Sequence, residues 1–83
     1  DIRTAKKVLM DLAKKEEKRI PESEPKVFVK ELGDSSVVLA LRFEAKTEDY
    51  WDVRFRMLEE IKYAIEEAGL HIPYPQLDVH TDK

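Results

Sequence analysis

Histidine and aspartate are the side chains of this chain that come nearest to a catalytic or metal-binding group. His71 and His80 are the two histidines, and Pro73 and Pro75 separate them, a spacing that places no two metal ligands on one helix face. Asp78 stands two positions before His80, so both side chains would share one face of a strand. We interpret this carboxylate–imidazole pair as a surface contact rather than a catalytic pair.

The remaining polar patterns do not favour catalysis either. Ser35 and Ser36 follow Gly33 and have no histidine near them in the sequence, so we interpret them as residues of a turn. Gly33 and Gly69 are the two glycines, too few for a loop that cradles phosphate, and the chain contains no cysteine for a disulfide or a thiolate metal site. We therefore expect no enzyme, no metal site and no cofactor.

Two large aromatic residues give the clearest functional hint. Trp51 and Phe55 stand four positions apart in a predicted helix, beside its main apolar stripe. Aromatic side chains are favoured both in cores and in contacts between proteins. The pair therefore either widens the core or contacts another chain, and the sequence leaves both interpretations open. The main stripe consists of Tyr50, Val53, Met57, Leu58, Ile61, Ala64, Ile65 and Ala68.

The first helix is predicted over residues 3–20, and Pro21 would end it. A cluster of cations occupies its last turns, where the helix dipole favours positive charge. We interpret this cluster as a solvated helix end, with a phosphate or lipid contact as the alternative. The apolar face consists of Ala5, Val8, Leu9, Leu12 and Ala13, and the cluster of Lys14, Lys15, Lys18 and Arg19.

Two strands are predicted over residues 26–32 and 37–46, paired as an antiparallel hairpin. Gly33 and Asp34 tolerate the positive φ of a tight turn between them. The second strand alternates most clearly, and one of its faces would join the core. That face consists of Val37, Leu39, Leu41, Phe43 and Ala45.

A second helix and a short strand complete the chain. Thr47 is expected to cap this helix and Gly69 to end it in the left-handed conformation. Pro73 and Pro75 forbid a regular central strand, and the alternation at residues 77–81 predicts a final strand after them. We expect this tail to leave the body of the domain and to contact other chains.

The order helix, strand, strand, helix, strand predicts the α+β class, with two layers and both helices on one sheet face. It matches a ferredoxin-like α-β-β-α-β sandwich whose first strand is missing or lies upstream of Asp1. Without that strand the sheet has an open edge, which either the chain's own tail or a second copy would cover. We therefore expect the chain to associate with itself at high concentration.

The composition describes one small domain with a dense, nearly balanced surface charge. Charged residues make up 40% of the chain and the net charge is −3. Residues 1–20 are net basic and residues 21–83 net acidic, so no broad basic face for nucleic acid is expected. No apolar run reaches about 18 residues, and we expect this piece to be soluble. Because the chain begins with Asp1 rather than Met, we expect it to be part of a longer protein.

Three runs resemble the cytoplasmic C-terminal domain of bacterial small-conductance mechanosensitive channels. They are residues 31–37, 47–55 and 68–76, and the basic helix around residues 5–9 resembles the helix that precedes them. The resemblance covers nearly the whole chain in the right order. Its most specific part is Ala68-Gly69-Leu70-His71-Ile72-Pro73-Tyr74-Pro75-Gln76.

The resemblance implies a role that the residue patterns alone do not. In this family seven subunits form a pore in the inner membrane and a hollow cytoplasmic cage, which releases ions and small solutes on osmotic downshock. Residues 1–76 would form part of the cage wall, and residues 77–83 would give one strand to a barrel between subunits. The piece alone is expected neither to sense tension nor to conduct. The expected subunit contacts are Trp51, Phe55, Pro73, Tyr74, Pro75, Leu77 and Val79.

Two other classes of function remain as alternatives. A ferredoxin-like ligand-binding or regulatory module would need a polar pocket, for which the sequence offers no cluster. A nucleic-acid-binding module would need aromatic residues in a basic surround on the sheet. The solvent-facing positions of the second strand, Val38, Ala40, Arg42 and Glu44, do not supply them.

Overall fold

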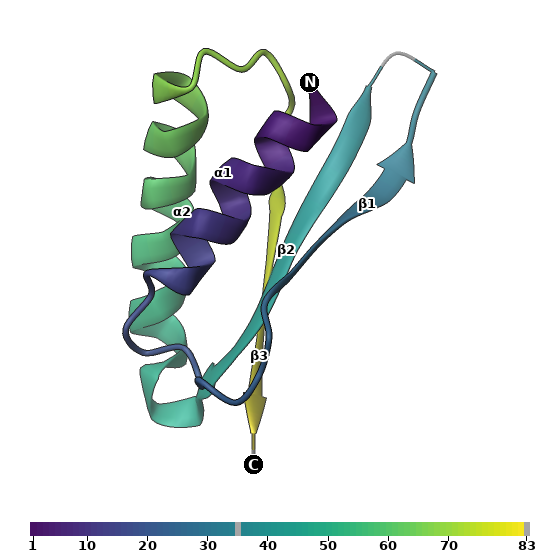
Figure 1. Cartoon of the computed structure of the whole chain (residues 1–83). Coiled ribbons are helices and arrows are strands. Elements are labelled where there is room, and N and C mark those ends of the chain that lie inside the picture. Colours follow the sequence, from purple (N-terminus) through teal and green to yellow (C-terminus); the bar gives the residue numbers. More distant parts are fainter. Residues whose placement is uncertain (35, 83) are drawn as a thin grey trace.

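A computed structural model of the chain describes residues 1–34 and 36–82, with the backbone alone at residue 82. The helices and strands follow one another in the predicted order (Figure 1). They are α1 (Ile2–Lys14), β1 (Lys26–Leu32), β2 (Val37–Lys46), a 3-10 turn (Thr47–Asp49), α2 (Tyr50–Glu67) and β3 (Gln76–Asp82).

The first helix is shorter than predicted. α1 ends at Lys14, not near residue 20. The chain needs the following residues to reach the sheet, where the backbone N–H of Ile20 donates to the carbonyl of Glu44 at 2.8 Å. The end of the helix is therefore set by this contact with β2 and not by Pro21.

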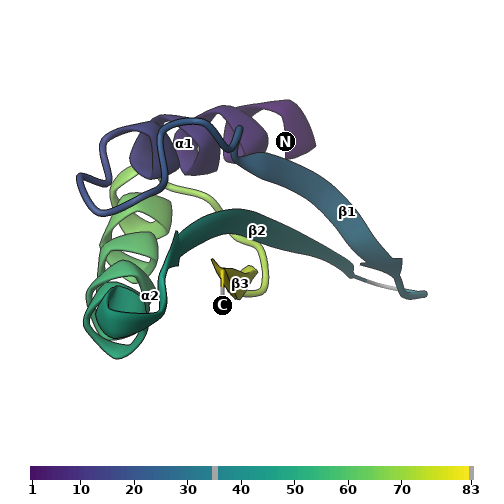
Figure 2. The ribbon, with the colours of Figure 1, turned by 90° about the horizontal axis from the view of Figure 1, so that it is seen from below.

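β1 and β2 pair as the predicted antiparallel hairpin, with a register shift between Val29 and Glu31. The N–H of Gly33 donates to the carbonyl of Ser36 at 2.8 Å across the turn. The prediction of positive φ at Gly33 and Asp34 was wrong, because among the described residues positive φ occurs at Gly69 alone; Ser35 lies outside them. The hairpin extends past both helices to its turn, so much of β1 is exposed (Figures 1 and 2).

The two ends of α2 differ in how well they were predicted. Thr47 does not cap α2, because a 3-10 turn intervenes and Asp49 takes the N-cap position. At the other end Gly69 has the predicted left-handed conformation, with φ of 71°. The N–H of Leu70 donates to the carbonyl of Ile65 at 3.2 Å, and the Leu70 side chain packs on the core, as expected for a glycine-ended helix.

In the single chain the tail packs within the domain, and its use between subunits stays a prediction. β3 pairs in parallel with β2, and the register places Leu77 beside Leu41 and Val79 beside Phe43. β2 is therefore the central strand of a three-stranded mixed sheet, in the order β1-β2-β3. Pairing with β3 covers one open edge of β2, so the chain's own tail fills this edge, as one of the two expected arrangements has it.

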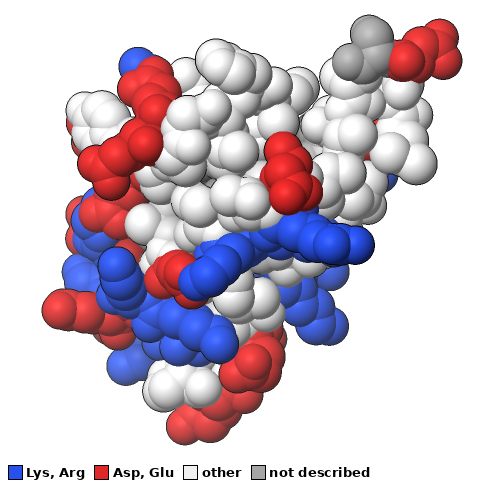
Figure 3. Space-filling view, turned by 45° about the horizontal axis from the view of Figure 1, so that its top comes forward, with Lys and Arg blue, Asp and Glu red and all other residues white. Residues whose placement is uncertain are grey.

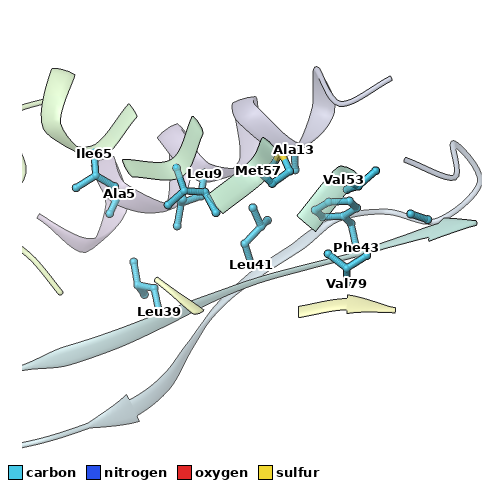
Figure 4. Close-up of a cluster of buried hydrophobic side chains, with 12 residues drawn as sticks. Ala5, Leu9, Ala13, Leu39, Leu41, Phe43, Val53, Met57, Ile65 and Val79 are labelled. Atoms are coloured by element: carbon cyan, nitrogen blue, oxygen red, sulfur yellow. The ribbon is translucent and has the colours of Figure 1, made fainter. Parts of the chain in front are cut away.

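Both helices pack on one face of the sheet, as predicted, and the chain forms a two-layer α+β domain. Figure 4 shows the core side chains of the helices facing those of β2. Phe43 lies on the inward face of β2 and is 1% exposed. The buried cluster consists of Ala5, Leu9, Ala13, Leu39, Leu41, Phe43, Ala45, Val53, Met57, Ile61, Ile65 and Val79.

Candidate subunit interface

α2 carries a second apolar stripe that the core does not cover. Trp51, Phe55 and Leu58, which we call the aromatic stripe, are 62%, 64% and 40% exposed. The rings of Trp51 and Phe55 lie 5.7 Å apart between centroids. The core interpretation of this pair is therefore wrong, because both rings lie outside the buried cluster. An exposed patch of this kind is characteristic of an interaction surface.

Leu58 is the member of this surface that the sequence reasoning missed. The prediction placed it in the main stripe with Met57, but Met57 is fully buried and Leu58 is not. Leu58 stands seven positions after Trp51 and three after Phe55, which is the spacing of one helix face. This spacing was the available signal, and it assigns Leu58 to the aromatic stripe.

The loop after α2 is held against the helix beside this surface. The hydroxyl of Tyr74 donates to Glu66 at 3.1 Å, and the hydroxyl of Tyr63 donates to Glu59 at 2.8 Å. These hydrogen bonds to carboxylates raise the pKa of both tyrosines. Both tyrosines are more than half exposed; Tyr63 lines the hollow between α1 and α2, and Tyr74 lies beside the C-terminal end of α2.

The predicted contact residues of the tail divide into two groups. Pro73 and Tyr74 are exposed and available to another chain. Pro75 and Val79 are buried, and Leu77 is half-buried against the core. In this arrangement Pro75, Leu77 and Val79 stabilise the domain itself. They could contact another chain only if β3 left the sheet.

A network of charged side chains joins the end of α1 to α2. The side chain of Glu16 is 2% exposed and binds the guanidinium of Arg56 and, at 3.0 Å, the backbone N–H of Lys18. The ammonium of Lys18 in turn binds Asp52 at 3.0 Å. That hydrogen bond raises the pKa of Lys18 and lowers the pKa of Asp52. The sequence did not indicate this network, because its partners are far apart along the chain.

The Asp78–His80 pair exists on the outer face of the sheet. The imidazole Nε2 of His80 lies 3.1 Å from Asp78, and the guanidinium of Arg42 lies 2.9 Å from it. Burial raises the pKa of Asp78, but the hydrogen bonds from His80 and Arg42 outweigh it, so the pKa is lowered. Arg42 also lies over the Phe28 ring at 5.4 Å. This contact ties β3 to β2 and β1.

Neither a metal cluster nor a membrane-spanning helix is found in the part of the chain that the structure describes. Across residues 1–34 and 36–82, no three His, Asp or Glu side chains converge as metal ligands would. Neither helix in those ranges combines the length and the apolar character that crossing a bilayer requires.

Comparison with known proteins agrees with the resemblance. Residues 1–72 match the family described as mechanosensitive ion channel MscS, C-terminal. An uncharacterized MscS family protein of Synechocystis is 42% identical over 59 residues, which are 71% of this chain and 20% of that protein. An uncharacterized MscS family protein of Archaeoglobus fulgidus is 43% identical over 53 residues, 64% of this chain and 19% of that protein.

A third relative has a more specific name. The small-conductance mechanosensitive channel of Edwardsiella ictaluri is 30% identical over 80 residues, 96% of this chain and 28% of that protein. The chain thus spans less than a third of the length of each of these relatives. No solved structure matches the chain.

Proposed function

The chain belongs to the MscS family of mechanosensitive ion channels, and we propose that it is the non-catalytic cytoplasmic domain of a tension-gated channel. The channel releases ions and small solutes during osmotic downshock, and this domain forms part of a hollow cage below the pore. The observation that carries the proposal is the match of residues 1–72 to the C-terminal domain of the family.

The proposed assembly is a ring of identical subunits, seven in the full channel. The exposed aromatic stripe supports it, because Trp51 and Phe55 are unfavourably placed in water and well suited to a protein contact. Pro73 and Tyr74 lie at the other end of α2 and extend the same contact. The parent protein resides in the inner membrane, with this domain on the cytoplasmic side.

Residues 77–81 serve a second contact in this proposal. They leave β2 in the assembled channel and contribute one strand per subunit to a barrel, so the wall domain is residues 1–76 and the tail residues 77–83. β3 is suited to this exchange because it is an edge strand of the sheet.

A chimeric channel tests the proposal. The matching C-terminal region of the Edwardsiella ictaluri channel is replaced by this chain, and the chimera is expressed in bacteria that lack their own mechanosensitive channels. We expect the chimera to protect the cells during osmotic downshock. A matched chimera with Val53→Asp, which places a charge in the fully buried core, should fail to protect. A chimera that reaches the membrane in normal amounts and gives no protection would contradict the proposal.

A further inference from the structure

The outward face of α1 is strongly basic. Arg3, Lys7 and Lys14 are exposed and recur on one side of the helix, with Lys6 and half-buried Met10 beside them. Figure 3 shows Lys and Arg side chains gathered in a band across this face. Lys7 pairs with Asp11 at 3.2 Å, while Arg3, Lys6 and Lys14 make no ion pair with any other side chain that the structure describes. The face therefore holds cations free to bind a partner.

The aromatic stripe of α2 is bordered by carboxylates. Glu59 and Glu66 stand beside it, four positions after Phe55 and eight positions after Leu58, and the ammonium of Lys62 on the same face lies 3.8 Å from Glu66, so Glu59 is the carboxylate there that pairs with no cation among the described residues. Exposed aromatic rings bind ammonium and guanidinium groups through their faces, and the carboxylates add charge attraction. The surface is thus suited to a basic helix that also carries an apolar side chain.

The basic face of α1 and the aromatic stripe of α2 cannot contact each other within one chain. Glu60 stands nine positions after Trp51, which places the two on opposite sides of the helix, and Glu60 lines the hollow between α1 and α2. Arg56 and Asp52 likewise reach toward the end of α1. The aromatic stripe therefore faces away from the α1 of its own chain.

We infer that the basic face of α1 in one copy of this chain docks on the aromatic stripe of α2 in the next copy. A contact between two aromatic stripes would leave the unpaired cations of α1 without a partner, and a contact between two α1 faces would oppose cations. A contact between unlike faces brings the α1 cations to the aromatic rings and the carboxylates beside them. A contact between unlike faces repeats from copy to copy and closes into a ring when the rotation permits. The inference deepens the proposed function and rests on it, because it names the surfaces that join the ring.

Charge exchange on the 83-residue chain tests the contact. One variant carries Arg3→Glu and Lys14→Glu, a second carries Glu59→Lys and Glu66→Lys, and a third carries all four changes. We expect the wild-type chain to associate in sedimentation equilibrium, and each double variant to weaken the association constant roughly tenfold or more. The four-fold variant should recover most of the loss, because it restores opposite charges. Far-UV circular dichroism and urea unfolding check that each variant is folded.

The single tryptophan reports on the same contact. Trp51 is the one Trp of the chain, so its emission should shift to shorter wavelength and its quenching by acrylamide should fall as the wild type associates. An unchanged Trp51 signal in the oligomer would contradict the inference, and so would a strict monomer at about millimolar concentration. Loss of association in both double variants without recovery in the third would also contradict it.

Two further outcomes distinguish a contact between copies from a contact with lipid or with an unrelated face. If Arg3→Glu with Lys14→Glu abolishes binding to phosphatidylserine vesicles and leaves self-association unchanged, the basic face serves lipid and the inference is wrong. In the chimeric channel, Lys14→Cys and Phe55→Cys should cross-link neighbouring subunits, while Lys14→Cys with Glu22→Cys should not. A chimera that protects cells without this cross-link leaves the proposed function standing and removes the inference.

Discussion

Two phenylalanines of this chain offer a matched test of where the core ends. Phe43 on β2 is 1% exposed, and Phe55 on α2 is 64% exposed. The same substitution, Phe→Ala, removes the same atoms from both positions. The structure therefore predicts a large difference in stability that arises from location alone.

The magnitudes follow from the buried fractions. Truncating a fully buried phenylalanine costs about 3–5 kcal/mol, since the transfer free energy is lost and a cavity remains. Burying a whole phenylalanine side chain contributes roughly 1.5–3 kcal/mol, so the third of Phe55 that is buried contributes about 0.5–1 kcal/mol. A domain of this size has a free energy of unfolding of about 4–12 kcal/mol. Phe43→Ala is thus expected to remove a large part of the free energy of unfolding, and Phe55→Ala a small part.

Urea unfolding followed by far-UV circular dichroism measures both values, with Trp51 fluorescence as a second probe of the same transition. Association measured in parallel should respond in the opposite order, because Phe55→Ala removes a ring from the proposed contact and Phe43→Ala does not. Equal losses of stability at the two positions would refute the reasoning. So would an unchanged association constant in Phe55→Ala.

Three further changes test other parts of the structure. Glu16→Ala should cost about 2–3 kcal/mol in urea unfolding, because it leaves Arg56 without its nearest carboxylate; a loss below about 0.5 kcal/mol would contradict this. Gly69→Ala should cost about 1 kcal/mol in thermal unfolding, since its φ of 71° strains an alanine, and Gly69→Asn should cost less; equal values would count against this role of the backbone angle. The pKa of Asp78 is lower in the folded chain than its unfolded value of about 3.9, so its contribution is present above that pH and is lost as the pH falls through the folded value. Asp78→Asn should therefore reduce the loss of unfolding free energy as the pH falls through this range. An unchanged dependence of the unfolding free energy on pH would show that Asp78 does not contribute.

The order of helices and strands could be predicted from the sequence because each of them has a clear local pattern. The alternation along β2 identified its buried face, and Gly69 marked the end of α2. The length of α1 could not be predicted, because it depends on a hydrogen bond between Ile20 and Glu44 that local patterns do not show. The pairing of β3 with β2 could not be predicted either, because the pairing of strands that are distant in the sequence depends on which edges of the sheet are free.

The aromatic surface was predictable in part. Spacing identified Trp51 and Phe55 as separate from the main stripe, but whether a ring is buried depends on how wide the sheet beneath α2 is, and local patterns do not determine that width. Leu58 was misplaced for the same reason. The ion-pair network around Glu16 was missed entirely, because its members lie on two segments that are far apart in the sequence.

Recording from the chimeric channel tests the central claim most directly. In membrane patches from cells that lack other mechanosensitive channels, the chimera with this chain as its C-terminal domain is expected to give a current that opens under suction and closes when suction is released. The matched Val53→Asp chimera should give none. A wild-type chimera that is present in the patch membrane as an oligomer and stays silent up to the tension that ruptures the patch would contradict the assignment of this domain to a tension-gated channel.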